Sequence, residues 1–365
     1  MDATTAIELL EAQPRVWDHC FSYVNAMTVQ CAVELEIADA VHGHGKPISL
    51  GELAAALEIS PAKAPFLSRL MRMLVHMAYF VEEEEEGGGY WVAPLGRFLL
   101  KDSPFNARSF VTCMNHPNLV DPWRHMSAWF RASENGVVEP QPPPPPPPSA
   151  LAHGGKKLYE VCSSDPPFGK MFAEAMGGDS WLFSRALVAK CKEAFEGLSS
   201  LVDVGGSTGT TAKVIAEAFP GIHCTVFDLP HVVAAAEETH RSSNPISYVA
   251  GDMLTDDDIP QADALLFKWV LIDWPDERCL QVLKQCKKAL TKNGGKGKVM
   301  IADHVLGHES FNDSSSLVFD LVNMACLEGH FRTEEQWSKL FSDAGFTNYT
   351  IIPVGGLRVL IQVYP

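Results

Sequence analysis

The segment Leu201-Val202-Asp203-Val204-Gly205-Gly206-Ser207-Thr208-Gly209 predicts the fold of the second half of the chain. Its apolar first residues predict a buried strand, and its glycines predict a tight turn that a ligand can approach closely. Residues 210–218 then have helical periodicity, and the start of such a helix points N–H groups at the turn. The G-x-G-x-x-G spacing of a dinucleotide site is absent, which disfavours NAD.

The next two strands end in acidic residues. Residues 223–228 end in Asp228, about 20 residues past the glycines, where an acid suits the two hydroxyls of a ribose. Residues 246–253 end in Asp252 and Met253, which suit the amino group and ring face of adenine. Strands that alternate with helices predict a parallel sheet with right-handed crossovers. The expected ligand is a nucleoside without a pyrophosphate, a description that S-adenosylmethionine fits.

The first half of the chain has a different pattern. Residues 6–42 carry more apolar helical positions than a solvent-facing helix pair needs, which predicts burial against another domain or a second subunit. Ser49 and Glu52 form a capping box at the start of a helix, and a further helix is expected from Pro61. Residues 79–92 predict a hairpin, so that helices and hairpin together indicate a winged helix.

Charge and composition exclude several classes of function. The net charge is -16, from 29 basic and 45 acidic residues, and the wing tip is the acidic run at 82–86. Nucleic acids and anionic membranes need a basic surface, so neither is expected as a partner. The nine cysteines include no C-x-x-C, so neither a disulfide framework nor a metal site is predicted. Without a signal peptide or long apolar segment, we expect a cytoplasmic protein.

These segments together resemble the plant S-adenosylmethionine-dependent O-methyltransferases of small phenolics. The similar segments are residues 201–209, 227–232, 251–253, 267–271, 334–337 and 343–346. Residues 323–327 are most similar to the isoflavone-methylating branch. The resemblance implies an α/β fold, in which a Rossmann-like methyltransferase domain with a mainly parallel sheet follows a helical, winged-helix-like dimerisation domain. It also implies a homodimer, a small aromatic or phenolic substrate, and S-adenosylmethionine or S-adenosylhomocysteine as cofactor.

The predicted organisation has three parts. Residues 1–135 form the dimerisation and substrate-lid domain, residues 136–155 form an exposed loop that contains seven consecutive prolines, and residues 156–365 form the cofactor domain. The resemblance implies cofactor contacts at Gly205, Asp228, Asp252, Met253, Lys268, Trp274 and Ser180. It implies a substrate pocket at Met114, Asn115, Phe172, Met176, Ile272, Asn323, Met324 and Phe331.

The chain departs from the family at its catalytic positions. The family has a histidine in K-W-[IV]-x-H-D-W, and Ile272 stands there. That histidine removes the phenolic proton as the oxygen attacks the methyl group, which isoleucine cannot do. One of the two acids that bracket the histidine is retained as Asp303, but the glutamate of G-K-E-R is replaced by Phe331. His304 and His330 are candidate substitute bases, and Asp303 is a candidate acid or base.

Three hypotheses remain open from the sequence. In the first, the enzyme binds the cofactor without transferring methyl and steers a cyclisation, such as a Diels–Alder-type pericyclic reaction, or an isomerisation of a phenolic or polyene substrate. In the second, it is an O-methyltransferase for an acidic phenol or enol, or one with a relocated base. In the third, it is a non-catalytic partner subunit of an active relative.

Overall fold

The protein is described by a computed structural model that covers residues 2–83, 88–132, 145–239, 245–255, 259–292, 297–308 and 313–365. The chain forms two compact units, Met1–His116 and Pro117–Pro365. The acidic tip expected at 82–86 and the proline run expected at 142–148 lie partly outside the described residues. Within the described residues, no helix has both the length and the apolar character needed to cross a membrane.

The first unit has the predicted helices and hairpin. Its elements are α1 (Ala3–Cys20), α2 (Ser22–Glu34), α3 (Ile37–Gly43), α4 (Leu50–Ala56), α5 (Ala64–His76), β1 (Phe80–Glu82), β2 (Tyr90–Val92), η1 (Leu95–Leu99) and α6 (Arg108–Met114). Ser49 and Glu52 form the predicted capping box of α4, and β1 pairs with β2 in an antiparallel hairpin. Helix α5 begins at Ala64 rather than Pro61, because residues 60–63 form a turn.

The second unit contains a seven-stranded sheet in the order β5-β4-β3-β6-β7-β9-β8. The first five strands in that order are parallel to one another, β9 pairs antiparallel with β7, and β8 pairs antiparallel with β9. The strands are β3 (Ser200–Val204), β4 (His223–Asp228), β5 (Ile246–Ala250), β6 (Ala264–Lys268), β7 (Lys298–Asp303), β8 (Asn348–Gly355) and β9 (Arg358–Tyr364). This topology confirms the Rossmann-like fold with a mainly parallel sheet.

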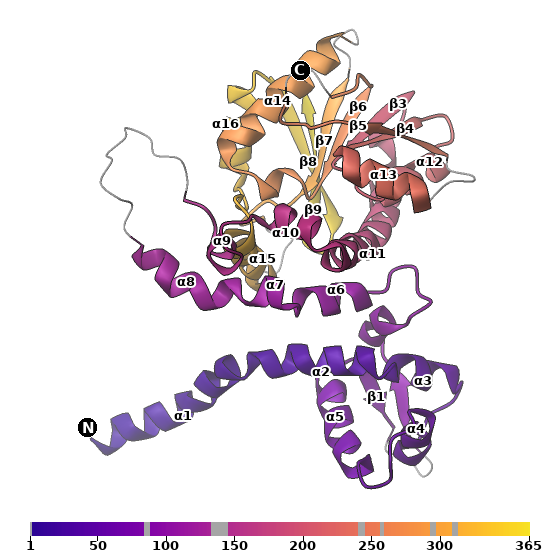
Figure 1. Ribbon diagram of the computed structural model, residues 1–365, viewed down its shortest axis with the longest axis vertical. Helices are drawn as coiled ribbons and strands as arrows, with labels where there is room; N and C mark the ends of the chain where they lie inside the picture. Colours follow the sequence, from indigo (N-terminus) through magenta and orange to yellow (C-terminus); the bar gives the residue numbers. More distant parts are fainter. Residues whose placement is uncertain are drawn as a thin grey trace. The chain divides into compact units, whose positions relative to one another are not determined.

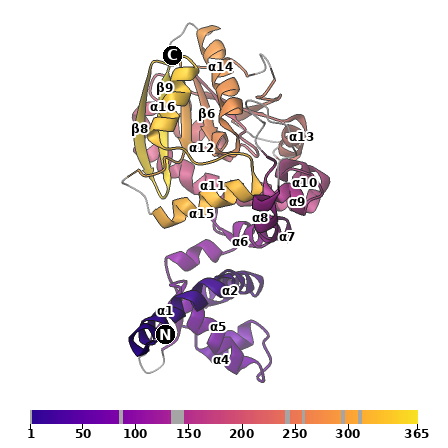
Figure 2. The same ribbon diagram turned by 90° about the vertical axis from the view of Figure 1, so that its left-hand side faces the viewer.

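Helices lie on both faces of this sheet, as Figures 1 and 2 show. The helices of the second unit are α7 (Pro117–Val120), α8 (Pro122–Arg131), α9 (Pro148–Ala152), α10 (Leu158–Ser164), α11 (Pro166–Lys190), η2 (Lys192–Ala194), α12 (Thr210–Ala218), α13 (Pro230–Thr239), η3 (Leu271–Asp273), α14 (Asp276–Lys292), α15 (Asp313–Cys326) and α16 (Glu334–Asp343). Successive side chains of a strand point to opposite faces. Val202 and Leu265 therefore join a core with α14 and α16, whereas Leu201 and Leu266 join another with α11 and α12.

The strand order reverses between β3 and β6. Strands β4 and β5 continue from β3 toward one edge, and β7 continues from β6 toward the other. Ligands of open α/β sheets bind beyond the carboxyl ends of the strands at such a switch point. Val204 pairs with Phe267, so the glycine turn after β3 and the segment after β6 begin at the same edge of the sheet.

Helix α9 differs from the exposed loop expected for residues 136–155. Pro148 begins the helix and is buried, and the buried Ser149 hydroxyl donates a hydrogen bond of 3.0 Å to the carbonyl of Cys326. Proline suits the first turn of a helix, where its missing N–H is not needed. The last residue of the proline run is therefore part of the second unit's packing. The predicted boundaries at residues 135 and 155 stay predictions.

The placement of β6 in the core makes a prediction about stability. Leu265 is 0% exposed, and we expect Leu265→Ala to lower the free energy of unfolding by about 2–5 kcal/mol, because it removes buried carbon and leaves a cavity. Leu182→Ala is the control, since Leu182 on α11 is 41% exposed; its expected change is within about 0.5 kcal/mol. Urea denaturation measures both, and equal losses would contradict the placement.

Candidate active site

Two glycines shape the turn that follows β3. Gly205 has a φ of 71°, and a Cβ there would lie 2.9 Å from Cγ2 of Val270. Gly209, at the start of α12, has a φ of 79°, and a Cβ there would lie 2.8 Å from the hydroxyl oxygen of Tyr248. Only glycine adopts these conformations without strain and leaves room for these neighbours. The backbone of this turn therefore lies at the switch point, where its glycines allow a ligand to approach it closely.

Asp228 ties this turn to the end of β4. Its carboxylate accepts the backbone N–H groups of Ser207, at 2.8 Å, and Leu229, at 2.7 Å. Burial raises the pKa of Asp228, and these two hydrogen bonds partly oppose the rise. A carboxylate has about four acceptor positions, so it can still accept hydroxyl donors from a ribose. Asp252, after β5, accepts the N–H of Leu254 at 2.9 Å. Both acids are at the edge where the sequence predicted a nucleoside.

Lys268 ends β6 and is almost fully buried. Its ammonium group donates a hydrogen bond of 2.9 Å to the hydroxyl of Ser180 and forms an ion pair of 2.8 Å with Asp179. Two of the predicted cofactor contacts, Lys268 and Ser180, are therefore side by side. Asp179 and Arg358, which form a second ion pair of 2.6 Å with each other, were not predicted as site residues.

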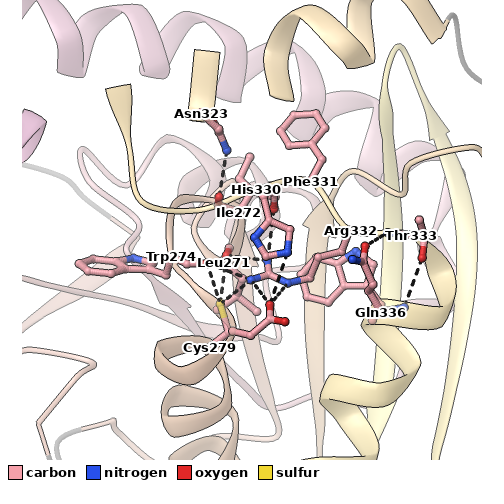
Figure 3. Close-up of polar contacts among 12 residues, drawn as sticks. Leu271, Ile272, Trp274, Cys279, Asn323, His330, Phe331, Arg332, Thr333 and Gln336 are labelled. Carbon is pink, nitrogen blue, oxygen red and sulfur yellow. Dashed lines mark hydrogen bonds and ion pairs between the residues drawn. The ribbon is translucent and has the colours of Figure 1, made fainter. Parts of the chain in front are cut away.

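Arg332 holds the turn that carries Ile272, as Figure 3 shows. Its guanidinium group donates to the carbonyl oxygens of Leu271 at 3.1 Å and Trp274 at 2.9 Å, and it forms an ion pair of 2.8 Å with Asp276. The Arg332 side chain is 0% exposed. These bonds fix the backbone on both sides of Ile272, so this turn is a rigid element rather than a free loop.

Ile272 and Asn323 are in direct contact. The Asn323 side chain donates a hydrogen bond of 2.9 Å to the Ile272 carbonyl (Figure 3). Ile272 itself is 5% exposed. Two residues predicted for the substrate pocket, 51 positions apart, thus meet at one point.

The segment that carries Phe331 passes close to the same turn. A Cβ on Gly329 would lie 1.9 Å from the carbonyl oxygen of Ile272, so only glycine allows this approach. Phe331 is 2% exposed, and its backbone N–H donates to Asp320 at 2.8 Å. Ile272 and Phe331 belong to one buried apolar cluster. Ile272 and Phe331 are therefore both part of a buried apolar surface, which we call the apolar floor, and their correspondence to the family's histidine and glutamate stays a prediction.

Neither substitute base predicted from the sequence is well placed. The ring of His304 packs 4.2 Å from that of Phe331, and burial lowers the pKa of His304 to about 3. A base with so low a pKa has little affinity for a phenolic proton. His330 is 3.6 Å from Asp276, and burial lowers its pKa as well.

Two carboxyl groups near Ile272 have raised pKa values. Burial raises the pKa of Asp303 to about 8, and its Oδ1 accepts the N–H of His304 at 2.8 Å. Its Oδ2 has no hydrogen-bond partner in the part of the chain that the structure describes. Burial also raises the pKa of Asp273 to about 7, and Asp273 accepts a hydrogen bond of 2.6 Å from Tyr159. The Tyr159–Asp273 pair had no signal in the sequence.

The remaining pocket residues fall in different places. Phe172 and Met176 are on α11, where the Phe172 ring lies 6.4 Å from that of Tyr159, and Met324 is on α15 beside Asn323. Met114 and Asn115 belong to the first unit, at the end of α6. The pocket roles of all these residues, and every cofactor role predicted from the sequence, stay predictions. Among the described residues, no group of three or more His, Cys, Asp or Glu side chains is arranged to hold a metal ion.

Comparison with known sequences identifies the family. Residues 123–347 match the O-methyltransferase domain, and residues 17–102 match the O-methyltransferase dimerisation domain. The chain belongs to the S-adenosylmethionine-dependent O-methyltransferases. These two matches divide the chain in the same order as its two compact units.

Several plant O-methyltransferases are similar over nearly the whole chain. "Probable O-methyltransferase 3" of Humulus lupulus is 41% identical, covering 100% of this chain and 96% of its own. The 8-hydroxyquercetin 8-O-methyltransferase of Mentha piperita is also 41% identical, with 98% and 97% covered. The trans-resveratrol di-O-methyltransferase of Vitis vinifera is 40% identical, with 98% and 97% covered.

Two solved structures share the fold at low sequence identity. Human N-acetylserotonin methyltransferase in complex with S-adenosylmethionine has a TM-score of 0.78 and 21% identity, covering 100% of this chain and 99% of its own. CalO1, a methyltransferase in calicheamicin biosynthesis solved with S-adenosylhomocysteine, has a TM-score of 0.76 and 21% identity. At such identities the similarity establishes the methyltransferase fold.

The close approach of Gly329 makes one prediction. We expect Gly329→Ala to lower the free energy of unfolding by more than about 1 kcal/mol, because the new methyl group collides with backbone that Arg332 holds in place. Gly221→Ala is the control, since a Cβ at Gly221 meets nothing within 4 Å. Urea denaturation compares the two variants. A Gly329→Ala variant as stable as the control would show that the turn yields freely.

The buried carboxyl of Asp303 makes a prediction about pH. Its pKa is raised from 3.8 to about 8 on folding, so the folded state keeps a proton that the unfolded chain releases. Its contribution to stability is therefore complete below pH 3.8 and is lost as the pH rises toward about 8. The neutral Asp303→Asn variant should gain stability relative to the original protein over that range. Urea denaturation from pH 5 to 9 measures the difference, and a difference independent of pH would contradict the prediction.

Proposed function

We propose that this protein is a homodimeric, methyltransferase-fold enzyme of plant specialised metabolism in which base-assisted methyl transfer is lost. In this proposal it binds S-adenosylmethionine or S-adenosylhomocysteine and cyclises or isomerises a phenolic or polyene substrate. The observation that carries the proposal is the apolar floor, where Ile272 and Phe331 are both buried. In this proposal, apolar side chains stand there in place of the family's proton acceptor. The sheet edge that carries Asp228, Asp252 and Lys268, which we call the cofactor edge, keeps its polar residues.

The chemistry of the cofactor edge fits a nucleoside with an amino-acid tail. Asp228 and Asp252 suit the ribose hydroxyls and the adenine amino group, and the glycine turn allows close approach of the ligand. Lys268 and Ser180 suit the polar end of the tail. When bound as S-adenosylmethionine, the cofactor supplies a sulfonium group, whose positive charge can stabilise developing negative charge.

In a cyclisation the floor and its neighbours contribute shape and one polar group. An apolar floor restricts a flexible polyene to few conformations, and such restriction alone lowers a barrier substantially. Asp303 is protonated at neutral pH because burial raises its pKa to about 8, so it offers an O–H donor. A donor fixed before the reaction can polarise a carbonyl of the substrate without moving a proton.

A second candidate function is O-methylation of an acidic phenol or enol. The Tyr159–Asp273 pair favours it, since Asp273 follows Ile272 directly and has a pKa of about 7. A base with a pKa near the working pH is effective for proton transfer. An acidic hydroxyl also needs little help, because it ionises in water. The names of the relatives above support the same reaction class.

An incubation with methyl-labelled S-adenosylmethionine and a panel of phenols and polyenes separates these functions. We expect the original protein to transfer no label at ordinary enzyme rates and to convert one substrate without a gain in mass. Restoring the base and its orienter with Ile272→His and Phe331→Glu together should raise methyl transfer by about 10²–10⁴. Ile272→His alone is the control for the orienter.

Other outcomes would lead to other functions. Methyl transfer by the original protein would contradict the cyclisation proposal, and its loss in Asp273→Asn would then support the relocated base. Absence of any turnover, together with a stable mixed dimer with an active relative, would instead indicate a partner subunit.

A further inference from the structure

Lys268, Asp179 and Arg358 form a buried charge cluster that the proposed function has not used. The Asp179 carboxylate is 2.8 Å from the ammonium group of Lys268. On its other side it accepts two hydrogen bonds from Arg358, at 2.6 and 2.8 Å, in the bidentate geometry that is the strongest for this pair. The side chains are 7%, 22% and 12% exposed for Lys268, Asp179 and Arg358, respectively, so solvent screens the three charges little.

Aromatic rings contact both cations of this charge cluster. The guanidinium carbon of Arg358 lies 4.2 Å from the ring centre of Phe183 and 4.5 Å from that of Trp269. The same Trp269 ring is 4.7 Å from the ammonium group of Lys268. Trp269 has a φ of 54°, a left-handed conformation that is costly for a bulky residue. A strained residue that contacts two cations at a ligand edge indicates that their position matters.

The charges also decide the protonation of Lys268. Burial and the nearby Arg358 both lower the pKa of Lys268, and Asp179 opposes them. Burial likewise raises the pKa of Asp179, but Lys268 and Arg358 outweigh burial and hold it below its usual value. The three groups therefore stay charged together, with a net charge of one positive unit. A buried positive charge beside Ser180 suits an anionic group.

We propose that Asp179 and Arg358 are positioning residues that hold the ammonium group of Lys268 toward the carboxylate of the cofactor's amino-acid tail. The inference rests on the proposed cofactor site, and it assigns roles to two residues outside that site's predicted contacts. Arg358 anchors Asp179 by two hydrogen bonds, and Asp179 orients Lys268 together with Ser180. The cofactor would contact Lys268, whereas Asp179 and Arg358 act through it.

Other titratable groups also face Lys268. Asp203 on β3 and Asp273 on η3 both interact with its charge, and burial raises the pKa of each to about 7. Arg358 lowers the pKa of His304, which follows β7, and Asp179 raises it. The affinity of the original protein therefore has its own pH dependence. Each variant is therefore compared with the original protein at the same pH.

Calorimetric titration of the full chain with S-adenosylhomocysteine from pH 6.5 to 9.5 tests the proposal. Asp179→Asn keeps the shape but removes the charge that supports the Lys268 ammonium group. We expect affinity at least about tenfold weaker, with a deficit that grows as the pH rises, because Lys268 then loses its proton earlier; one pKa unit corresponds to a factor of about ten. Arg358→Lys keeps the charge but loses the bidentate geometry, and should weaken affinity less, without the added pH dependence.

Two controls keep these outcomes apart. Glu217→Gln breaks the exposed ion pair of 3.6 Å between Arg185 and Glu217 and should leave affinity unchanged. In the Asp179→Asn, Lys268→Met double variant, the added pH dependence should disappear, which a general loss of structure would not produce. Asp179→Asn with the original affinity at every pH would overturn the positioning role while leaving the cofactor site intact. Failure of the original protein to bind S-adenosylhomocysteine would overturn the proposed cofactor site, and this role with it.

Discussion

The parallel pairing of β3 with β6 is the constraint on which the site depends. These two strands are adjacent although β4 and β5 separate them in the sequence, so the strand order reverses between them. The glycine turn after β3 and the Lys268 end of β6 consequently lie at the same edge of the sheet. Asp228 strengthens this arrangement, because it accepts hydrogen bonds from the turn while it ends β4. The residues predicted to bind the cofactor thus come together because the sheet topology brings these strand ends to one edge.

The floor of the site depends on a different set of forces. Arg332 satisfies the carbonyls of the Ile272 turn from a fully buried position, and Gly329 allows a second backbone segment to pass against that turn. Buried carbonyls without partners are costly, so these hydrogen bonds are needed whatever side chain occupies position 272. The backbone around Ile272 is therefore held in place independently of its side chain. In the proposed function, Ile272 and Phe331 stand in place of a base and its orienter, and such a replacement changes the chemistry at this turn while it leaves the backbone hydrogen bonds in place.

Burial sets the protonation of the groups around this floor. His304 is neutral beside the Phe331 ring, and Asp303 holds a proton at neutral pH because its charge would lie in an apolar environment. By contrast, Asp179 and Lys268 remain charged because each compensates the other. Charged groups therefore gather at the end of β6, whereas neutral groups surround Ile272 and Phe331. This division fits the proposed function, in which the cofactor supplies electrostatic support and the protein removes no proton.

Much of this protein was determined by local sequence. The glycine turn, the acids at the ends of β4 and β5, the capping box of α4 and the hairpin were all predicted, because turns, caps and alternating strands depend on neighbouring residues. Only the tertiary structure decided the Asp179–Arg358 ion pair, whose members are 179 positions apart, and the Tyr159–Asp273 pair, whose members are 114 apart. It also decided which acids keep their protons and that α9 is packed rather than exposed. Burial and long-range contacts set these features, and both arise only when distant segments pack together.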